Sequence, residues 1–205
     1  MGLFNRKADT TGTTTATIEV DPALVALTGD YTIDPAHSSI GFTVRHAMVT
    51  NVRGSFGEFA GKLQLNGTDP HHSTAEIDVK IASVDTGIAD RDNHLRTGDF
   101  FEAEKFPTMT FRSTHAEQLG GDKYRITGDL TIKDVTRPLS IDLDFNGSAT
   151  DPYGNKRVGF EGSADILRSD WGLGWNAALE TGGVLVGDKV KLLFDISAIK
   201  AAPQA

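Results

Sequence analysis

Cysteine is absent from this chain of 205 residues. Its absence excludes disulfides, cysteine-ligated zinc, iron–sulfur clusters, thiol nucleophiles and the acylated cysteine of a bacterial lipoprotein. Long hydrophobic runs are also missing, because the longest, such as residues 23–27, span about five residues where a membrane helix needs roughly 20. An excess of basic residues is missing too, with 20 Lys and Arg against 28 Asp and Glu. The resulting net charge of −8 argues against nucleic acid as a partner.

A secretory leader is not visible either. Residues 1–7 are basic, but Asp9 and a threonine-rich run follow where a signal peptide has its apolar segment. We therefore expect a cytoplasmic location, with no integral membrane segment.

Glycine is abundant, with 22 residues. Many of these glycines lie inside the expected strands, such as Gly41, Gly128 and Gly159. Apolar and polar residues alternate along these strands, as in Leu139 to Phe145, and this period of two is typical of strands with one buried face. The strands expected from alternation and turn signals cover residues 40–44, 59–65, 77–81, 108–114, 124–132, 139–145, 158–167 and 189–199. About eight antiparallel strands with short connections predict an all-β sandwich or up-and-down barrel, in which the glycines allow bulges and bends.

Short helices are expected at three places outside these strands. The first covers residues 21–27, with Asp21 as its N-cap and Pro22 in the first turn. The second lies around residues 90–95, and the third around residues 175–179 before Gly182. We divide the chain into an N-terminal extension with a short helix (1–28), one barrel domain (29–200) and a tail (201–205).

The candidate chemical motifs are weak. The six histidines show no metal-ligand spacing, so no metal site is predicted. Residues 172–177 (GLGWNA) imitate a dinucleotide-binding turn, but no strand–turn–helix unit of a parallel sheet surrounds them. Asp92 and His94 are two positions apart on the expected second helix, so they point to different sides and cannot form an acid–base pair directly.

Several ordered motifs resemble the YceI-like family of polyisoprenoid-binding, lipocalin-like bacterial proteins. They are residues 31–38 (YTIDPAHS), 40–46 (IGFTVRH), 52–54 (VRG), 59–61 (FAG), 83–86 (SVDT), 91–95 (RDNHL), 99–101 (DFF), 105–111 (KFPTMTF), 128–132 (GDLTI), 135–138 (VTRP) and 168–172 (RSDWG). The resemblance covers roughly residues 30–198. It implies an extended, lipocalin-like antiparallel up-and-down barrel of about eight strands, with short helical lid segments and an apolar tunnel.

The resemblance also implies a function. It is the non-catalytic binding, storage or transport of an isoprenoid-type or other long-chain amphiphile, such as a polyisoprenoid or a quinone, with no other cofactor and with a homodimer as a possible assembly. Two alternatives stay open: an enzyme that acts on a lipid in the same cavity, using His46, Asp92 and His94, and an interaction module with a filled core.

The predicted ligand-binding residues fall into two groups. Alternation along the strands suggests that these side chains line the tunnel: Phe42, Val44, Phe59, Ile81, Phe106, Met109, Phe111, Leu130, Ile141, Leu143 and Trp171. His46, Arg91 and His94 are the candidates for a polar mouth that holds a headgroup.

Overall fold

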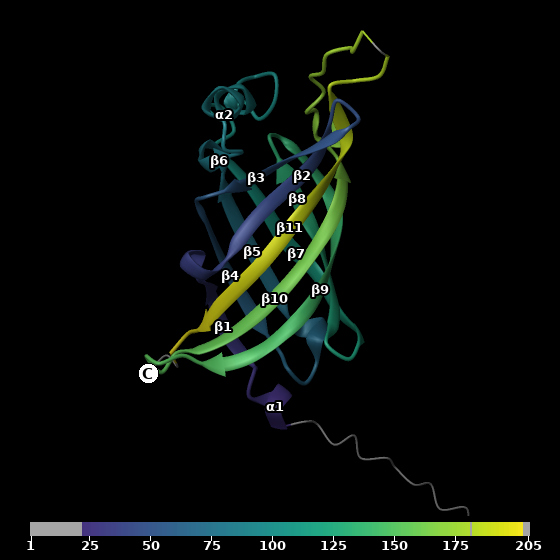
Figure 1. Ribbon diagram of the computed structural model, residues 1–205. Helices are drawn as coiled ribbons and strands as arrows, with labels where there is room; N and C mark the ends of the chain where they lie inside the picture. The colour runs from purple at the N-terminus through teal and green to yellow at the C-terminus, as the bar shows by residue number, and fades with distance from the viewer. Residues whose placement is uncertain (1–21, 181, 203–205) are drawn as a thin grey trace, which may run out of the picture.

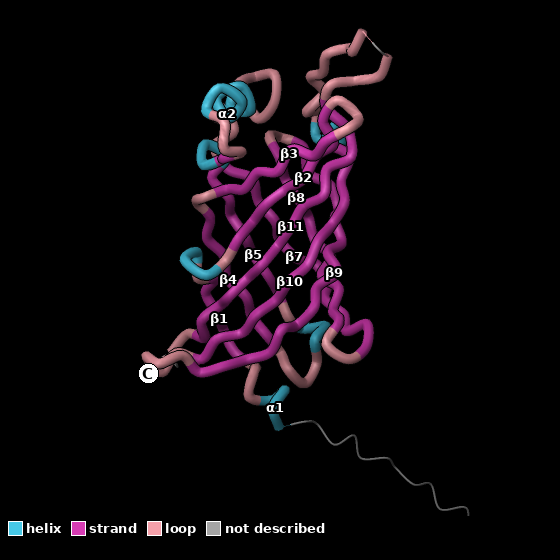
Figure 2. The backbone as a smooth tube through the Cα atoms, in the orientation of Figure 1, coloured by secondary structure: helices cyan, strands magenta, loops and turns pink. Residues whose placement is uncertain are grey.

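The computed structural model describes residues 22–180 and 182–202, and most of them lie in strands (Figures 1 and 2). The strands are β1 (Gly29–Ile33), β2 (Ser39–His46), β3 (Thr50–Phe56), β4 (Phe59–Leu65), β5 (Thr74–Lys80), β6 (Val84–Asp85), β7 (Thr108–Gly120), β8 (Lys123–Ile132), β9 (Val135–Thr150), β10 (Lys156–Leu167) and β11 (Val186–Lys200). The helices are α1 (Pro22–Val25) and α2 (Ala89–Arg96), with 3-10 turns η1 (Pro35–His37), η2 (Pro70–His72), η3 (Ile81–Ser83) and η4 (Arg168–Trp171). None of the described helices has the length and apolarity to cross a membrane.

Eight strands form a closed antiparallel barrel. Their order is β1-β4-β5-β7-β8-β9-β10-β11, and the pairing of Tyr31 with Lys200 returns the last strand to the first. The predicted all-β, lipocalin-like barrel is therefore confirmed. Because closure leaves no free edge on these strands, their backbone groups are paired around the ring.

The long strand β11 has two neighbours on the same side. Its last residues pair with β1, whereas residues such as Val190 and Leu192 pair with Val44 and Phe42 of β2. Strands β2, β3 and β6 thus extend one end of the barrel beyond β1. We call this end, which also carries α2 and the loop 172–185, the α2 end, and the opposite end the α1 end (Figure 1).

Alternation along the strands decides which side chains enter the core. On β9, Leu139 and Ile141 are buried and Leu143 and Phe145 are partly buried, whereas the intervening Ser140, Asp142 and Asp144 are exposed. The core combines such inward faces from every strand of the barrel.

The helices agree only in part with expectation. Helix α2 is confirmed, and α1 is shorter than predicted, while the proposed N-cap Asp21 lies outside the described residues. The helix predicted at residues 175–179 is wrong, because the backbone there bonds to a distant segment. The side-chain oxygen of Asn176 accepts a hydrogen bond from the Val186 amide, and Ala178 forms a bridge with Val184.

Candidate functional site

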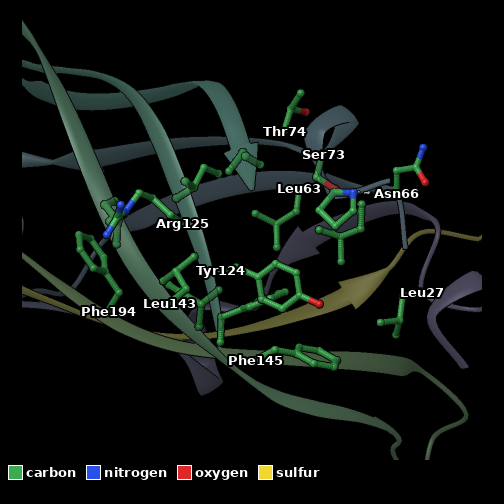
Figure 3. A pocket seen from close by; sticks show the side chains of 18 of the residues that line it. Leu27, Leu63, Asn66, Ser73, Thr74, Tyr124, Arg125, Leu143, Phe145 and Phe194 are labelled. Carbon is green, nitrogen blue, oxygen red and sulfur yellow. Dashed lines mark hydrogen bonds between the residues drawn. The ribbon is translucent and has the colours of Figure 1, made fainter. Parts of the chain in front are cut away.

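An apolar cavity of about 130 Å³ lies inside the α1 end of the barrel (Figure 3). Leu63, Tyr124, Leu143, Phe145 and Phe194 reach it from four strands, β4, β8, β9 and β11. The inward faces of the alternating strands supply these five side chains, and residues of the connections at this end complete the lining.

A second, smaller cavity of about 30 Å³ continues along the barrel interior. Met109 and Leu130 line only this chamber, whereas Ile77, Phe111, Ile141 and Phe194 line both. These four shared side chains form a constriction between the chambers. The apolar interior thus contains two separate cavities, with these four side chains between them.

Helix α1 and the residues after it cover the larger chamber. Leu24 and Leu27 line the cavity. The Tyr31 hydroxyl donates to the Leu27 carbonyl at 2.8 Å, and the Gly67 amide donates to Thr28 Oγ1 at 3.1 Å. Segment 22–28 is therefore a cover that two leucines and a few polar contacts hold in place.

Few polar groups reach the larger chamber. The Arg125 guanidinium donates two hydrogen bonds to the carboxylate of Asp142, at 2.6 and 2.9 Å, so its charge is already compensated. Burial raises the pKa of the Tyr124 hydroxyl, which stays neutral and available as a hydrogen-bond donor. Asn66 and Ser73 line the same end, and the Ser73 hydroxyl accepts a hydrogen bond from the backbone amide of Asn66. This chamber offers neutral polar groups rather than a free cation.

Five of the predicted tunnel residues line the two cavities. Phe111 and Ile141 line both, Leu143 lines the larger, and Met109 and Leu130 line the smaller. Of the remaining six, Phe42, Phe59, Ile81 and Trp171 are buried in the core, while Val44 and Phe106 are partly buried. Direct contact of any of them with a ligand stays a prediction.

The candidates for the polar mouth lie at the α2 end, away from the larger cavity. His94 Nε2 lies 2.8 Å from Asp99 Oδ2, and its ring packs edge-on against Trp175. The Arg91 guanidinium donates to the hydroxyl and carbonyl of Thr86. His46 ends β2 and is partly buried. The structure thus engages Arg91 and His94 in contacts within the α2 region.

The acid–base pair considered for an enzyme is not assembled in this arrangement. Asp92 is buried and accepts hydrogen bonds from the amide and hydroxyl of Thr86, whereas the imidazole of His94 turns to Asp99. These bonds fasten the start of α2 to the chain that leads into it.

Aromatic side chains fill the α2 end of the barrel. Phe100 and Trp171 are buried, and Trp175 packs 5.3 Å from Phe100 between ring centroids. Trp171 Nε1 donates to the Leu130 carbonyl at 3.1 Å. Arg168 is buried beside them, donates to the carbonyls of Leu173 and Gly187, and has its pKa lowered by desolvation. These contacts anchor the beginning of the loop that follows η4 and the start of β11 to the α2 end.

Sequence reasoning missed several residues of the larger chamber. Phe145 and Phe194 continue inward-facing alternations that the sequence shows, so the same pattern can identify them. Leu24 and Leu27 carry no such signal, because their place depends on how the segment before the barrel folds over its end.

Comparison with known proteins decides the family. The model of the YceI-like domain matches residues 31–198. This chain belongs to the YceI-like family. The resemblance found in the motifs is therefore confirmed.

Relatives of this YceI-like chain include UPF0312 proteins from several bacteria. One from Photorhabdus laumondii is 38% identical over 148 residues, which cover 71% of this chain and 77% of that protein. One from Staphylococcus aureus is 36% identical over 170 residues, covering 82% of this chain and 95% of that protein.

Solved structures of the YceI fold are also similar. The YceI protein of Campylobacter jejuni has a TM-score of 0.67 at 31% identity, covering 82% of this chain and 96% of that one. BcnA of Burkholderia cenocepacia has a TM-score of 0.72 at 24% identity, covering 80% and 98%. A polyisoprenoid-binding domain from Saccharophagus degradans has a TM-score of 0.63 at 16% identity, covering 83% and 98%. The last two similarities show a shared fold.

Proposed function

We propose that this YceI-like barrel binds the apolar chain of an isoprenoid-type or other long-chain amphiphile and stores or transports it without chemical change. The observation that carries the proposal is the apolar, two-chamber interior, which a filled-core interaction module does not need. The Saccharophagus domain, described as polyisoprenoid-binding, has the same fold and supports the ligand class.

The size of the larger chamber defines how a ligand fits. A cavity of about 150 Å³ holds one benzene molecule, so about 130 Å³ has room for roughly one isoprene unit. A longer chain needs the constriction at Ile77, Phe111, Ile141 and Phe194 to open, so that both chambers join. Each buried CH₂ group then contributes about 0.8 kcal/mol before ordering costs.

The chemistry of the lining favours an uncharged polar end on the ligand. Tyr124 supplies a neutral hydroxyl, and Arg125 is already paired with Asp142. A phosphate placed there would be desolvated without a free cation to compensate it, whereas a carbonyl or hydroxyl finds a hydrogen-bond partner.

We also propose that the residues of the α2 end have no catalytic role. The engagement of Asp92 by Thr86 and of His94 by Asp99 supports it over the enzyme alternative. The cytoplasmic location and the homodimer stay predictions, which cell fractionation and analytical ultracentrifugation test.

Organic extraction of the purified protein, followed by mass spectrometry, tests the proposal. We expect a co-purified amphiphile with an isoprenoid or acyl chain, or stoichiometric uptake of an added one. Failure of the protein to carry or take up any such molecule would overturn it.

A cavity-filling variant sharpens this experiment. Ala75 is buried and lines the larger chamber, so Ala75→Leu places three additional carbons there and should lower ligand occupancy severalfold. Ala60→Leu is the matched control, because Ala60 is exposed on the adjacent strand β4. Equal occupancy in both variants would place the ligand elsewhere.

A further inference from the structure

The tip of the β2–β3 hairpin exposes large apolar side chains at the α2 end. Val49 is 74% exposed and Met48 is 56% exposed. Val184, in the loop 172–185, is exposed as well, and a Cβ built on its neighbour Gly183 would lie 3.6 Å from Met48 Cγ. We call Met48, Val49 and Val184 the hydrophobic tip.

The backbone of this tip is held in an unfavourable conformation. Ala47 and Met48 have φ angles of 48° and 61°, in the left-handed region where Asn and Gly are favoured. The Ala47 amide donates to the Leu185 carbonyl at 2.7 Å, which ties the hairpin to the loop 172–185. A tight turn that presents Met to solvent, at a position better suited to Asn, favours a role for the side chain outside the fold.

Basic side chains lie on the outer face of the strands that lead to the hydrophobic tip. Arg45 and Arg53 lie on the strands that lead to it, and Lys189 and Lys191 lie on the neighbouring β11. Asp165 pairs with Lys189 at 2.8 Å, and Asp188 accepts hydrogen bonds from Ser169. Arg45 donates only to the Asn51 side chain, and Arg53 makes no ion pair within the described ranges. Two uncompensated guanidinium groups therefore flank the tip of a chain whose net charge is −8.

We propose that the hydrophobic tip docks this protein on an anionic lipid surface. Met48, Val49 and Val184 enter the headgroup region, while Arg45 and Arg53 meet the negative lipids. A protein partner or a second copy would also cover an apolar patch, but the pairing of a small protruding apolar tip with flanking cations fits a lipid surface best. Val184 belongs to the same loop as Trp175, which packs against Phe100, so docking turns the α2 end toward the bilayer.

Vesicle flotation with the full chain tests this proposal. We expect the protein to float with phosphatidylglycerol-containing vesicles and to bind phosphatidylcholine vesicles more weakly, with binding that decreases as salt rises. The double variant Met48→Asn/Val49→Ser should lower the partition coefficient about tenfold or more, because it removes apolar area while Asn suits the left-handed turn. Arg53→Gln should lower binding to anionic vesicles severalfold and reduce the salt dependence.

Tyr153→Ser is the matched control, because Tyr153 is 90% exposed in the turn between β9 and β10. This turn lies at the opposite end of the barrel, where Arg157 pairs with Ile199 near the end of β11. The control variant should bind vesicles like the wild type. Absence of wild-type flotation, or equal flotation of the double variant, would overturn the proposal. A change in oligomeric state of the double variant in analytical ultracentrifugation, without vesicle binding by the wild type, would assign the patch to a second copy. Docking does not require a filled cavity, so it can fail while ligand extraction succeeds, and the reverse.

Discussion

Gly128 shows how a single residue controls the packing of the barrel wall. A Cβ atom built at this position would lie 2.4 Å from the Arg112 carbonyl oxygen and 2.7 Å from Phe111 Cζ, so even a methyl group has no space. Phe111 lines both chambers, and the missing side chain of Gly128 leaves room for its ring.

We expect Gly128→Ala to destabilise the fold by about 1–3 kcal/mol through overpacking. Gly98→Ala is the control, because nothing lies within 4 Å of a Cβ there, and its effect should be within about 0.5 kcal/mol. Urea denaturation measures both. Equal stability of the two variants would contradict the close approach at Gly128.

The sequence indicates that glycines occur within strands, and it predicts only part of their role. The register shift between Gly159 and Phe160 confirms the expected bulge. At Gly128 the reason is instead the approach of Phe111 from the neighbouring strand, which depends on the pairing register and cannot be read from one strand alone.

At the scale of elements, a cluster of charged residues joins η1 to the β9–β10 hairpin. Arg157 donates to Asp34 Oδ2 at 2.6 Å and to Asp151 Oδ2 at 2.9 Å. The Arg157 guanidinium lowers the pKa of Asp34, and hydrogen bonds from Asn155 and Arg157 lower the pKa of Asp151.

Because folding lowers both carboxyl pKa values, their stabilisation is present above the unfolded value of about 3.9 and is lost as the pH falls below it. We expect the urea midpoint to decrease below about pH 4, and Arg157→Gln to make this decrease smaller. Lys123→Gln, which removes an exposed ion pair with Asp144, should leave the acid slope closer to that of the wild type. An identical acid slope in Arg157→Gln would exclude this cluster as its source.

The cover over the larger chamber predicts a kinetic effect. Leu27 lines the cavity, so Leu27→Ser should weaken the cover and speed the uptake of a fluorescent long-chain probe by up to about tenfold. Val25→Ser is the control on the same segment, because Val25 is exposed and does not line the chamber. Stopped-flow fluorescence compares the rates, and equal rates would mean that ligands reach the chamber by another route.

For the whole molecule, periodicity and ordered motifs predict the barrel, because the alternation of apolar and polar residues within each strand identifies its buried face. The cavities are harder to predict, because a cavity remains only where side chains from opposite walls of the barrel do not contact one another, and this depends on the complete fold. The helix predicted at residues 175–179 does not form for a related reason: the Asn176 side chain accepts a hydrogen bond from the Val186 backbone amide, and this contact overrides the local helix signals.

The two ends of the molecule have different properties. The α2 end carries the aromatic side chains of Phe100, Trp171 and Trp175 and the hydrophobic tip, while the larger chamber lies under α1. If the α2 end faces a bilayer, as proposed, the α1 cover faces away from it, so a ligand that enters through the cover is taken up on the side away from the bilayer.

The pairing of β1 with β11 also has a consequence for biosynthesis. Tyr31 joins Lys200, so the first and last strands of the barrel meet across nearly the whole domain. While the ribosome is still making β11, the nascent sheet has two unpaired edges and an open apolar face. Such long-range contacts slow folding, so this final ring-closing step is where molecular chaperones would have most effect on the yield of native protein.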